Sequence, residues 1–507
     1  MLEQILVGIQ ISLQPINILY CFIGVFIGTL IGVLPGIGPV GAMSLLLPAT
    51  FRVSPVGAII MLAGIYYGAQ YGGSTTSILV NIPGEASSVV TCLDGYQMAR
   101  KGRAGPALGI SAFGSFIAGT LSIVGLMFLA NPLANYALQF GPPEYFTLMC
   151  LGLVILTFLT QGSMYKALMM ALLGLLISFI GLDLFTSTTR FTFGIDELMD
   201  GVGIVPLVMG LFGVAEILRN LELPYEATEI YETNIKGLFP TLKDWAVAKW
   251  AILRGTIIGF FLGILPGGGA VLSSFVSYAI EKRVSKYPER FGTGVIEGVA
   301  APESANNAAA QSSFIPLLSL GIPPNVVMGI LFGGLLIHGI QPGPLLIRNH
   351  PDIFWGVVMS MYLGNVMLLA LNLPLIGIWV KVLKIPYHYL FPLILLLCLI
   401  GVYSVNNSVV DIYLMVIFGI VGYLMQKLGF EPALLALAYI LGPILETSLR
   451  QSLNISGGSF SIFFCRPISL VCLLLVAGLL VFQIFSYVKR NLLSPIDKGD
   501  NESQGVE

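Results

Sequence analysis

Two interrupted hydrophobic segments constrain this chain more than any other feature of its sequence. Residues 28–48 are apolar enough for a bilayer, yet Pro35-Gly36-Ile37-Gly38-Pro39 in their middle cannot continue a helix. Residues 259–269 repeat this pattern at one constant offset. The matching pairs are Gly28 with Gly259, Gly32 with Gly263, Pro35 with Pro266, Gly36 with Gly267 and Gly38 with Gly269. Because unpaired backbone groups at membrane depth are tolerated only inside protein or beside a polar cavity, two matching breaks indicate a transporter binding site.

Composition places the whole chain in a membrane. Of its 507 residues, 56% are hydrophobic and only 10% are charged, whereas about 25% of the residues of a soluble domain are charged. Apolar runs of roughly 20 residues recur from end to end, which is the length that spans a bilayer as a helix. The net charge of −2 argues against nucleic-acid binding. We expect an all-α polytopic membrane protein with about 10–12 membrane segments.

The order of segments repeats along the chain, which predicts two repeats separated by a linker. Residues 219–249 form the longest charged segment, and a second irregular point is duplicated, Ile82-Pro83-Gly84 against Ile322-Pro323-Pro324. Asn131-Pro132 predicts a turn after a helix at about 106–130. The expected divisions are a first repeat over 1–219, a charged cytoplasmic linker over 220–250, a second repeat over 251–490 and a polar C-terminal tail over 491–507.

Loop charges predict that the two repeats cross the membrane in opposite senses. In the first half, the loop after the break holds Arg52 and the next loop holds three cations at 100–103. In the second half, the corresponding loops hold four cations at 282–290 and then Arg348. Cytoplasmic loops collect Lys and Arg, so the reversed bias indicates inverted-topology repeats and a cytoplasmic C-terminus. Residues 255–280 then begin and end on one side, which makes the second Leu-Pro-Gly break a re-entrant hairpin.

The breaks favour a site for an anion and a cation. A half-helix that begins at membrane depth offers free N–H groups to an anion, and exposed carbonyls of the preceding half-helix can bind Na⁺. The alternative is close helix packing through small residues, which we favour for Gly28 and Gly32. Flanking prolines favour the substrate site for Gly36, Gly38, Gly267 and Gly269. The irregular points add Asn81 and Pro323 to the expected substrate site.

Two polar clusters, at residues 66–77 and 303–313, lie between the irregular points of each half. Polar side chains at membrane depth face a bundle interior or a cavity, and helix–helix hydrogen bonding is the alternative to a binding role. The expected substrate donors or Na⁺ ligands are Ser74, Thr75, Asn306 and Asn307. Na⁺ would use the side chains of Thr75 and Asn306 and carbonyls near Gly36 and Gly267.

Acidic residues near the second cluster are the expected coupling groups. Glu297 and Glu303 could each bind a cation or carry a proton, and the alternative is a role at the cytoplasmic mouth of the repeat. Glu85 and Asp94 lie nearer the basic loop, and we expect mostly structural roles for them.

Enzymatic functions fit the sequence poorly. Residues 36–41 match G-x-G-x-x-G, but they lie within a membrane segment and no acidic residue follows until Glu85. The chain has no Walker-type loop, no G-x-S-x-G and no H-E-x-x-H, and its cysteines and histidines do not cluster. We therefore expect no enzyme and no cofactor. A channel or scaffold without coupled transport is the alternative function, although no acidic filter ring is evident.

Several stretches resemble the large membrane subunit of the tripartite tricarboxylate transporters (TctA type). They are residues 32–41, 66–85 and 94–102 of the first half and 263–269, 301–308 and 321–324 of the second half. The resemblance covers about residues 15–485. It implies a secondary active transporter, a symporter of the bacterial inner membrane driven by Na⁺ or alternatively H⁺.

The resemblance also implies partners and a substrate class. A small four-helix membrane subunit and a periplasmic solute-binding protein would work with the permease, which would import citrate-like tricarboxylates or related carboxylates. In this family the binding protein largely selects the substrate, and no residue of this sequence identifies it.

Overall fold

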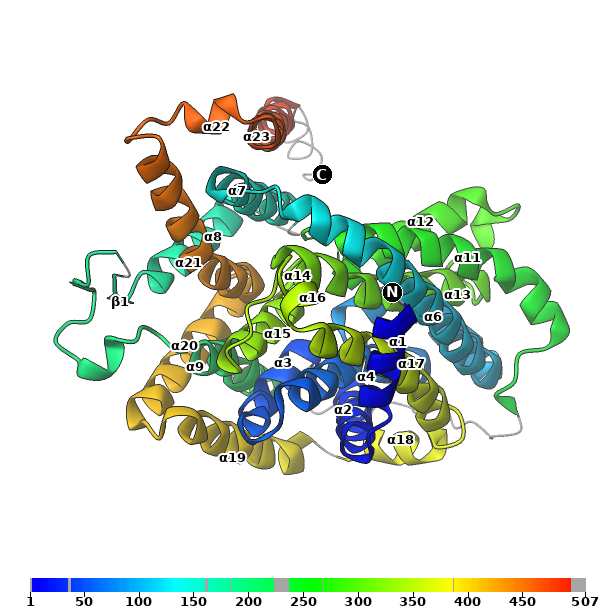
Figure 1. Cartoon of the computed structure of the whole chain (residues 1–507). Helices are drawn as coiled ribbons and strands as arrows, with labels where there is room; N and C mark the ends of the chain where they lie inside the picture. The colour runs from blue at the N-terminus through cyan, green and yellow to red at the C-terminus, as the bar shows by residue number, and fades with distance from the viewer. Residues whose placement is uncertain are drawn as a thin grey trace, which may run out of the picture.

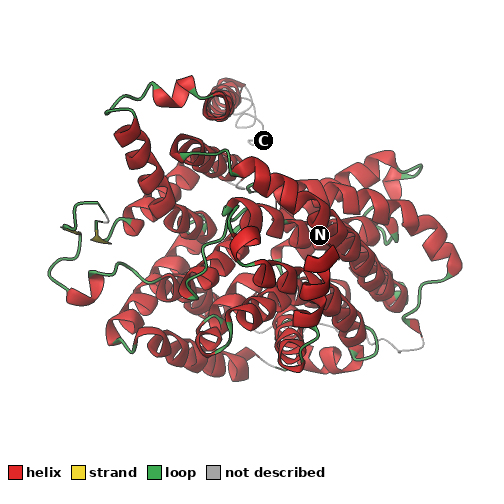
Figure 2. Cartoon of the chain, viewed as in Figure 1, coloured by secondary structure: helices red, strands yellow, loops and turns green. Residues whose placement is uncertain are grey.

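The protein is almost entirely helical (Figure 2). The computed structural model describes residues 2–34, 38–159, 163–183, 185–222, 237–267, 269–385 and 387–493. In this part of the chain the strands are β1 (Gly181–Leu182) and β2 (Thr189–Arg190), which pair antiparallel. Seven helical segments of the described residues are long and apolar enough to cross a membrane: Pro15–Val33, Ala104–Ala137, Ile204–Glu222, Leu242–Ile264, Pro351–Asn372, Val409–Lys427 and Pro432–Ile455. The prediction of an all-α polytopic membrane protein is confirmed.

The helices are numbered in chain order, and Figure 1 labels them where there is room. The first half contains α1 (Leu2–Ser12), α2 (Pro15–Val33), α3 (Gly38–Leu46), η1 (Pro48–Arg52), α4 (Pro55–Val80), η2 (Ala86–Ser88), α5 (Val89–Arg100), α6 (Ala104–Ala137), α7 (Pro142–Leu159), α8 (Met164–Ser178), η3 (Asp196–Leu198), α9 (Ile204–Val208), the π-helix η4 (Met209–Val214) and α10 (Ala215–Glu222). The second half contains α11 (Leu242–Ile264), α12 (Gly269–Val284), η6 (Pro288–Arg290), α13 (Glu297–Ser312), α14 (Phe314–Leu320), α15 (Val326–Ile337), α16 (Leu346–Asn349), α17 (Pro351–Asn372), α18 (Ile376–Leu383), α19 (Tyr387–Asn406), α20 (Val409–Lys427), α21 (Pro432–Ile455), α22 (Ile462–Cys465) and α23 (Pro467–Leu493).

Both breaks fall where the sequence predicts them. Helix α2 ends at Val33 and α3 begins at Gly38, while α11 ends at Ile264 and α12 begins at Gly269. Pro35, Gly36, Ile37 and Gly268 lie outside the described residues.

Helices α11 and α12 form a hairpin. Arg254 of α11 donates two hydrogen bonds to Glu281 of α12, at 2.8 Å from Nε and 2.6 Å from Nη2. The start of α11 is tied to the loop before α6 by the Arg103–Asp244 ion pair, and Lys101 donates to the carbonyl of Thr293 after α12. Both ends of the hairpin therefore lie at one end of the molecule, on the right of Figure 1. The predicted hairpin is confirmed.

The two irregular points have nearly the same backbone conformation. Asn81 (φ 61°) caps the end of α4, and Gly321 (φ 72°) caps the end of α14. Four residues later, Glu85 (φ −150°) caps η2 and Asn325 (φ −152°) caps α15. Two unrelated loops would have no reason to share this sequence of dihedral angles, so the duplication is present in the backbone as well as in the sequence.

Glycines allow α2 and α11, the helices that lead into the two breaks, to contact α4 and α13 closely. A Cβ built on Gly28 would collide with the backbone carbonyl oxygen of Ile65 in α4, and one on Gly259 would collide with that of Ala305 in α13. Gly32 contacts α4 in the same way. This is the packing role that the sequence favours for Gly28 and Gly32.

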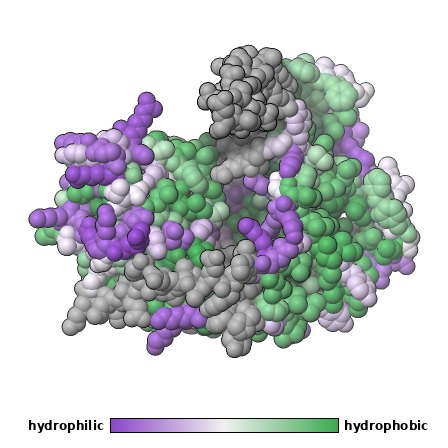
Figure 3. Space-filling view, turned by 180° about the vertical axis from the view of Figure 1, so that it is seen from behind, coloured by the Kyte–Doolittle hydropathy of each residue, from purple (hydrophilic) through white to green (hydrophobic). Residues whose placement is uncertain are grey.

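Helices α4 and α13 form the centre of the bundle. Every residue of α4 from Gly57 to Val80 is buried, as is every residue of α13 from Gly298 to Ser312. Much of the outer surface is hydrophobic, and hydrophilic residues gather toward the left edge of Figure 3. The polar clusters of the sequence are therefore carried by the least exposed helices, inside an apolar shell.

Some boundaries differ from the sequence-based predictions. Helix α6 continues through Pro132 to Ala137, so the turn predicted at Asn131-Pro132 is wrong. Ending a helix in an apolar setting would leave several backbone groups unpaired, whereas an internal proline leaves one. Helix α11 begins at Leu242, within the range expected for the linker, and residues 223–236 of that range lie outside the described residues. The same holds for residues 494–507 of the expected tail.

Candidate functional site

Glu303 of α13 lies at the centre of a buried polar network. Its side chain is 1% exposed. The carboxylate accepts hydrogen bonds from the hydroxyls of Ser74 on α4 and Thr91 on α5, and from Ser111 on α6 at 3.3 Å. All three donors come from the first half, whereas Glu303 comes from the second. The site therefore exists only where the halves meet.

A second buried carboxylate belongs to the same network. Glu85, 7% exposed, precedes η2 and accepts hydrogen bonds from the backbone N–H of Ser87 at 3.2 Å and from the hydroxyl of that residue. Asn306 of α13 donates to Glu85 at 3.0 Å, and its Oδ1 lies 2.9 Å from the hydroxyl of Ser87. The sequence suggests a mostly structural role for Glu85. The feature of the sequence that points to Glu85 as a site residue is its position at the duplicated irregular point.

Asn307 extends the network along α13. Its Nδ2 donates to Ser115 of α6 at 2.7 Å and to the backbone carbonyl of Glu303 at 3.2 Å. The structure thus brings together Ser74, Asn306 and Asn307, which the sequence selects as site residues. Thr75 is buried on α4 next to Ser74, and it is Ser74 that donates to Glu303 from this helix.

Among the described residues, Glu85 and Glu303 have no Lys, Arg or His as an ion-pair partner. Other buried acids do: Glu144 pairs with Arg466, Glu281 with Arg254 and Asp183 with Arg450. Burying an ionised carboxylate without a counter-charge costs several kcal/mol in general, a penalty that a bound proton or cation removes. The network therefore contains two buried carboxylates whose charge a proton or a cation would neutralise. It is built of carboxylate, hydroxyl and amide oxygens, the ligands that Na⁺ would require.

The glycines at the breaks differ from the packing glycines. Gly38 (φ 61°), Gly267 (φ 77°) and Gly269 (φ 50°) adopt the left-handed conformation that glycine adopts without strain. No described atom lies within 4 Å of a Cβ built on Gly38. The N–H of Gly267 donates to the carbonyl of Pro324 at 2.8 Å, which ties the second break to the second irregular point. Gly36 lies outside the described residues.

The irregular points contain two predicted residues and one that sequence reasoning missed. Asn81 is exposed and acts through its backbone as a helix cap, while Pro323 is buried beside Pro324. Asn325 caps α15 by accepting from the N–H of Met328 at 3.0 Å, and its buried Nδ2 has no hydrogen-bond partner among the described residues. The sequence signal that identifies Asn325 is its position, which is equivalent to that of Glu85 at the first irregular point.

Glu297 lies apart from the network. It is half-buried at the start of α13, and six helical residues place it about 9 Å along the axis from Glu303.

Asp94 has the structural role expected for it. The carboxylate accepts from the Tyr278 hydroxyl at 2.8 Å. It also accepts from the backbone N–H groups of Gly292 at 3.0 Å, Gly294 at 2.7 Å and Val295 at 2.9 Å. Asp94 therefore holds the loop between α12 and α13 against α5.

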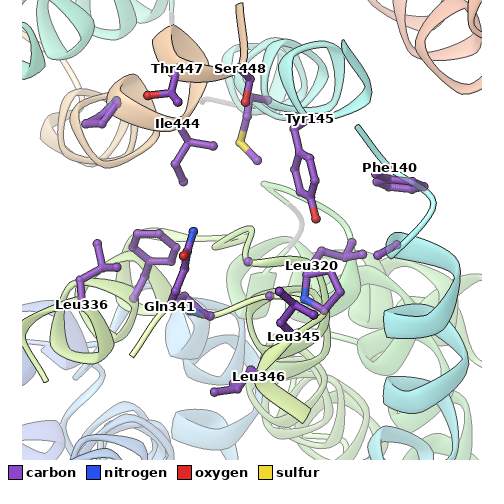
Figure 4. A pocket seen from close by; sticks show the side chains of 18 of the residues that line it. Phe140, Tyr145, Leu320, Leu336, Gln341, Leu345, Leu346, Ile444, Thr447 and Ser448 are labelled. Atoms are coloured by element: carbon purple, nitrogen blue, oxygen red, sulfur yellow. The ribbon is translucent and has the colours of Figure 1, made fainter. Parts of the chain in front are cut away.

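A cavity of about 870 Å³ lies beside the second irregular point, between α7, α21 and the segment from α15 to α16 (Figure 4). Tyr145 and Gln341 point into it. Gly321 belongs to its lining, and a Cβ at that position would lie 2.6 Å from the carbonyl oxygen of Pro342. The cavity thus reaches the end of α14, where the loop that contains Pro342 lies against Gly321.

The sequence matches a known transporter family along most of its length. Residues 18–437 match the tripartite tricarboxylate transporter TctA family. An uncharacterized 52.8 kDa protein in the TAR-I ttuC' 3' region of Agrobacterium vitis is 52% identical over 469 residues, covering 92% of this chain and 93% of that protein. An uncharacterized protein in the TAR-II ttuC' 3' region of the same organism is 53% identical over 224 residues, covering 43% of this chain and 93% of that protein. No solved structure matches the chain.

Proposed function

Since this chain belongs to the tripartite tricarboxylate transporter TctA family, whose members are membrane transporter components, we propose that it is the permease subunit of a secondary transporter. It imports tricarboxylates or related carboxylates by symport with Na⁺ or H⁺. A small four-helix membrane subunit and a periplasmic solute-binding protein are its partners, and it resides in the bacterial inner membrane with a cytoplasmic C-terminus.

The observation that carries this proposal is the environment of Glu303. Three hydroxyls from the other half surround a buried carboxylate that has no counter-charge among the described residues. The hydroxyl of Tyr71 is also buried, has no hydrogen-bond partner among the residues that the structure describes, and interacts electrostatically with Glu303. Hydroxyl oxygens can turn their protons away and become cation ligands, so this position can take up the coupling cation when the substrate binds.

The substrate binds between the two breaks in this proposal. The starts of α3 and α12, at Gly38 and Gly269, direct backbone N–H groups and the positive ends of their helix dipoles toward the breaks. The Nδ2 of Asn325, which has no hydrogen-bond partner in the described part of the chain, lies 3.8 Å from a Cβ built on Gly269 and adds a neutral donor. In this proposal the substrate approaches this region through the cavity beside Gly321.

Uptake of a labelled carboxylate into proteoliposomes tests the proposal. The vesicles contain this chain with its two partner proteins, and uptake is measured with an inward Na⁺ gradient and, separately, with an inward proton gradient. We expect one of the two gradients to drive uptake. Glu303→Gln should lower the gradient-driven rate about tenfold or more, because the carboxylate that binds the coupling cation becomes a neutral amide. Glu216→Gln neutralises a half-buried glutamate of α10 outside the network and should leave the rate unchanged.

The breaks are tested with a second pair of variants. Gly267→Leu should abolish uptake because it fills the break and strains a left-handed residue. Gly377→Leu is the matched control, since no described atom lies within 4 Å of a Cβ at that exposed position. Uptake that ignores both gradients and survives Glu303→Gln would instead indicate a channel.

A further inference from the structure

The loop between α8 and α9 exposes aromatic side chains on a strained backbone. Phe191 is 57% exposed and Phe193 is 85% exposed. Both have left-handed φ angles, 54° and 51°, which are rare for bulky residues. Such conformations persist only where the surrounding structure holds them in place. The loop therefore keeps two large apolar side chains away from the helix bundle.

A buried ion-pair network fastens the base of this loop to α21. The Asp183 carboxylate, 4% exposed, pairs with Arg450 at 2.8 Å and accepts from the backbone N–H of Phe185 at 2.8 Å. Arg190 of β2 donates to both carboxylate oxygens of Glu446, at 2.8 Å and 3.2 Å. Asp183 directly follows β1, so α21 holds the loop at both strands of its sheet. Because the base is already fixed, a partner that docks on the loop pays less conformational entropy.

Acidic side chains follow the phenylalanines along the loop. Asp196, Glu197 and Asp200 are all exposed, and in the described part of the chain none of them forms an ion pair. An apolar centre with charged groups at its edge is typical of a protein–protein interface, and the negative sign favours a partner with basic residues. A bilayer surface fits less well, since anionic lipids would repel the same three side chains.

Contacts between helix ends place the loop at the face opposite the expected cytoplasmic linker. Lys427, at the end of α20, pairs with Glu222 at the end of α10 at 2.8 Å. Lys166, in the first turn of α8, donates to the carbonyl of Leu428. The end of α8 and the start of α9 therefore lie at the other face, and the loop that contains β1 projects at the left of Figure 1. In the proposed topology this face is periplasmic.

Helix α21 separates this loop from the cavity. Glu446 and Arg450 face the loop, whereas Thr447, Ser448 and Gln451 line the cavity (Figure 4). The loop and the cavity thus lie on two sides of the same two turns of α21. A protein docked on the loop lies beside the cavity through which the substrate approaches in the proposed function.

We propose that residues 185–200 are the docking surface for the periplasmic solute-binding protein. That protein contributes an apolar recess for Phe191 and Phe193 and basic residues opposite the three acids. The proposal rests on the proposed function and extends it, because it assigns the place where the binding protein delivers its substrate.

The Kd of the labelled solute-binding protein for the permease tests this docking surface. The permease and its small membrane subunit are held in lipid nanodiscs, in which both faces are accessible, and binding is followed by fluorescence anisotropy. Phe193→Ala should raise the Kd about tenfold or more, since it removes an aromatic anchor of the interface. Phe239→Ala is the matched control, because it removes an exposed phenylalanine of the expected cytoplasmic linker and should leave the Kd unchanged.

Charge reversal gives a second, independent variant. Glu197→Lys should slow association several-fold at low ionic strength, and the difference from the wild type should shrink as salt is added. Glu289→Lys reverses an exposed acid between α12 and α13 and should leave the association rate unchanged. An association rate for Glu197→Lys that equals the wild-type rate at every salt concentration contradicts a basic partner surface.

The outcomes separate docking from transport. An unchanged Kd for Phe193→Ala overturns the docking surface while the proposed function stands, and lipid would then be what these phenylalanines contact. If the wild-type permease binds no solute-binding protein, the docking surface and the proposed partner are both wrong. If Phe193→Ala and Glu197→Lys weaken binding although uptake follows neither gradient, the docking surface stands and the coupled transport is wrong.

Discussion

At the residue scale, glycine has two separate roles in this protein. Gly28, Gly32 and Gly259 lack a Cβ at points where two helix backbones touch. Gly38, Gly267 and Gly269 instead adopt left-handed conformations at the breaks. Sequence reasoning distinguished them only by the prolines beside the second group. Glu85 illustrates a limit at the same scale: the sequence suggests a mostly structural role for it, and nothing in the linear sequence places it beside Asn306.

Paired leucine substitutions should separate these two glycine roles. Gly28→Leu forces α2 and α4 apart against a backbone carbonyl, so we expect destabilisation that exceeds about 3 kcal/mol and little folded protein. Gly38→Leu meets no described atom, so its stability loss should be the strain of a left-handed residue, about 1–2 kcal/mol. Thermal unfolding of the purified variants in detergent measures both. Equal losses would contradict the distinction between the two groups.

At the element scale, a break in a hydrophobic segment can produce either a bent span or a hairpin, and contacts decide between them. The α11–α12 hairpin is held by the Arg254–Glu281 pair, of which the Glu281 side chain is 4% exposed. Helix ends were less predictable than the breaks. α6 passes through Pro132 because its neighbours and the apolar surroundings favour continuing the helix.

The Arg254–Glu281 pair should stabilise the hairpin measurably. Arg254→Ala leaves a buried carboxylate unpaired, so we expect a loss of about 1–3 kcal/mol, less than for a fully buried pair because Arg254 is partly exposed. The double variant Arg254→Met with Glu281→Met should recover part of this loss, since it removes the unpaired charge as well. Thermal unfolding of Arg254→Met, Glu281→Met and the double variant gives the coupling energy through a double-mutant cycle, and a coupling near zero would show that packing alone holds the hairpin.

At the scale of the whole molecule, the two halves are interlocked rather than placed side by side. Helix α13 of the second half packs against α4, α5 and α6 of the first, and the network around Glu303 crosses this boundary. The basic loops of both halves meet where Lys101 bonds to Thr293 and Arg103 pairs with Asp244. This meeting agrees with the loop charges that led us to predict inverted repeats.

Accessibility labelling tests that arrangement in cells. In a chain whose native cysteines have been replaced by serine, cysteines introduced at Lys101 and Lys286 should both resist a membrane-impermeant thiol reagent in intact cells and react after the membrane is opened. A cysteine at Arg348, whose loop is expected on the opposite side, should react in intact cells. Reaction of Lys101→Cys and Lys286→Cys from opposite sides would contradict the inverted topology.

The sequence by itself determined the membrane setting, the helical class, the positions of both breaks and the duplication of the irregular points. These features are local, because hydrophobic length, proline and glycine act on the backbone within a few residues. Only the tertiary structure decided which polar residues meet. Glu303 depends on Ser74, Thr91 and Ser111, which lie far from it in the chain and reach it because small residues let α4 and α13 pack at the centre. A carboxylate becomes buried only when the surrounding helices exclude water, so the polar network around Glu303 arises from packing between the halves.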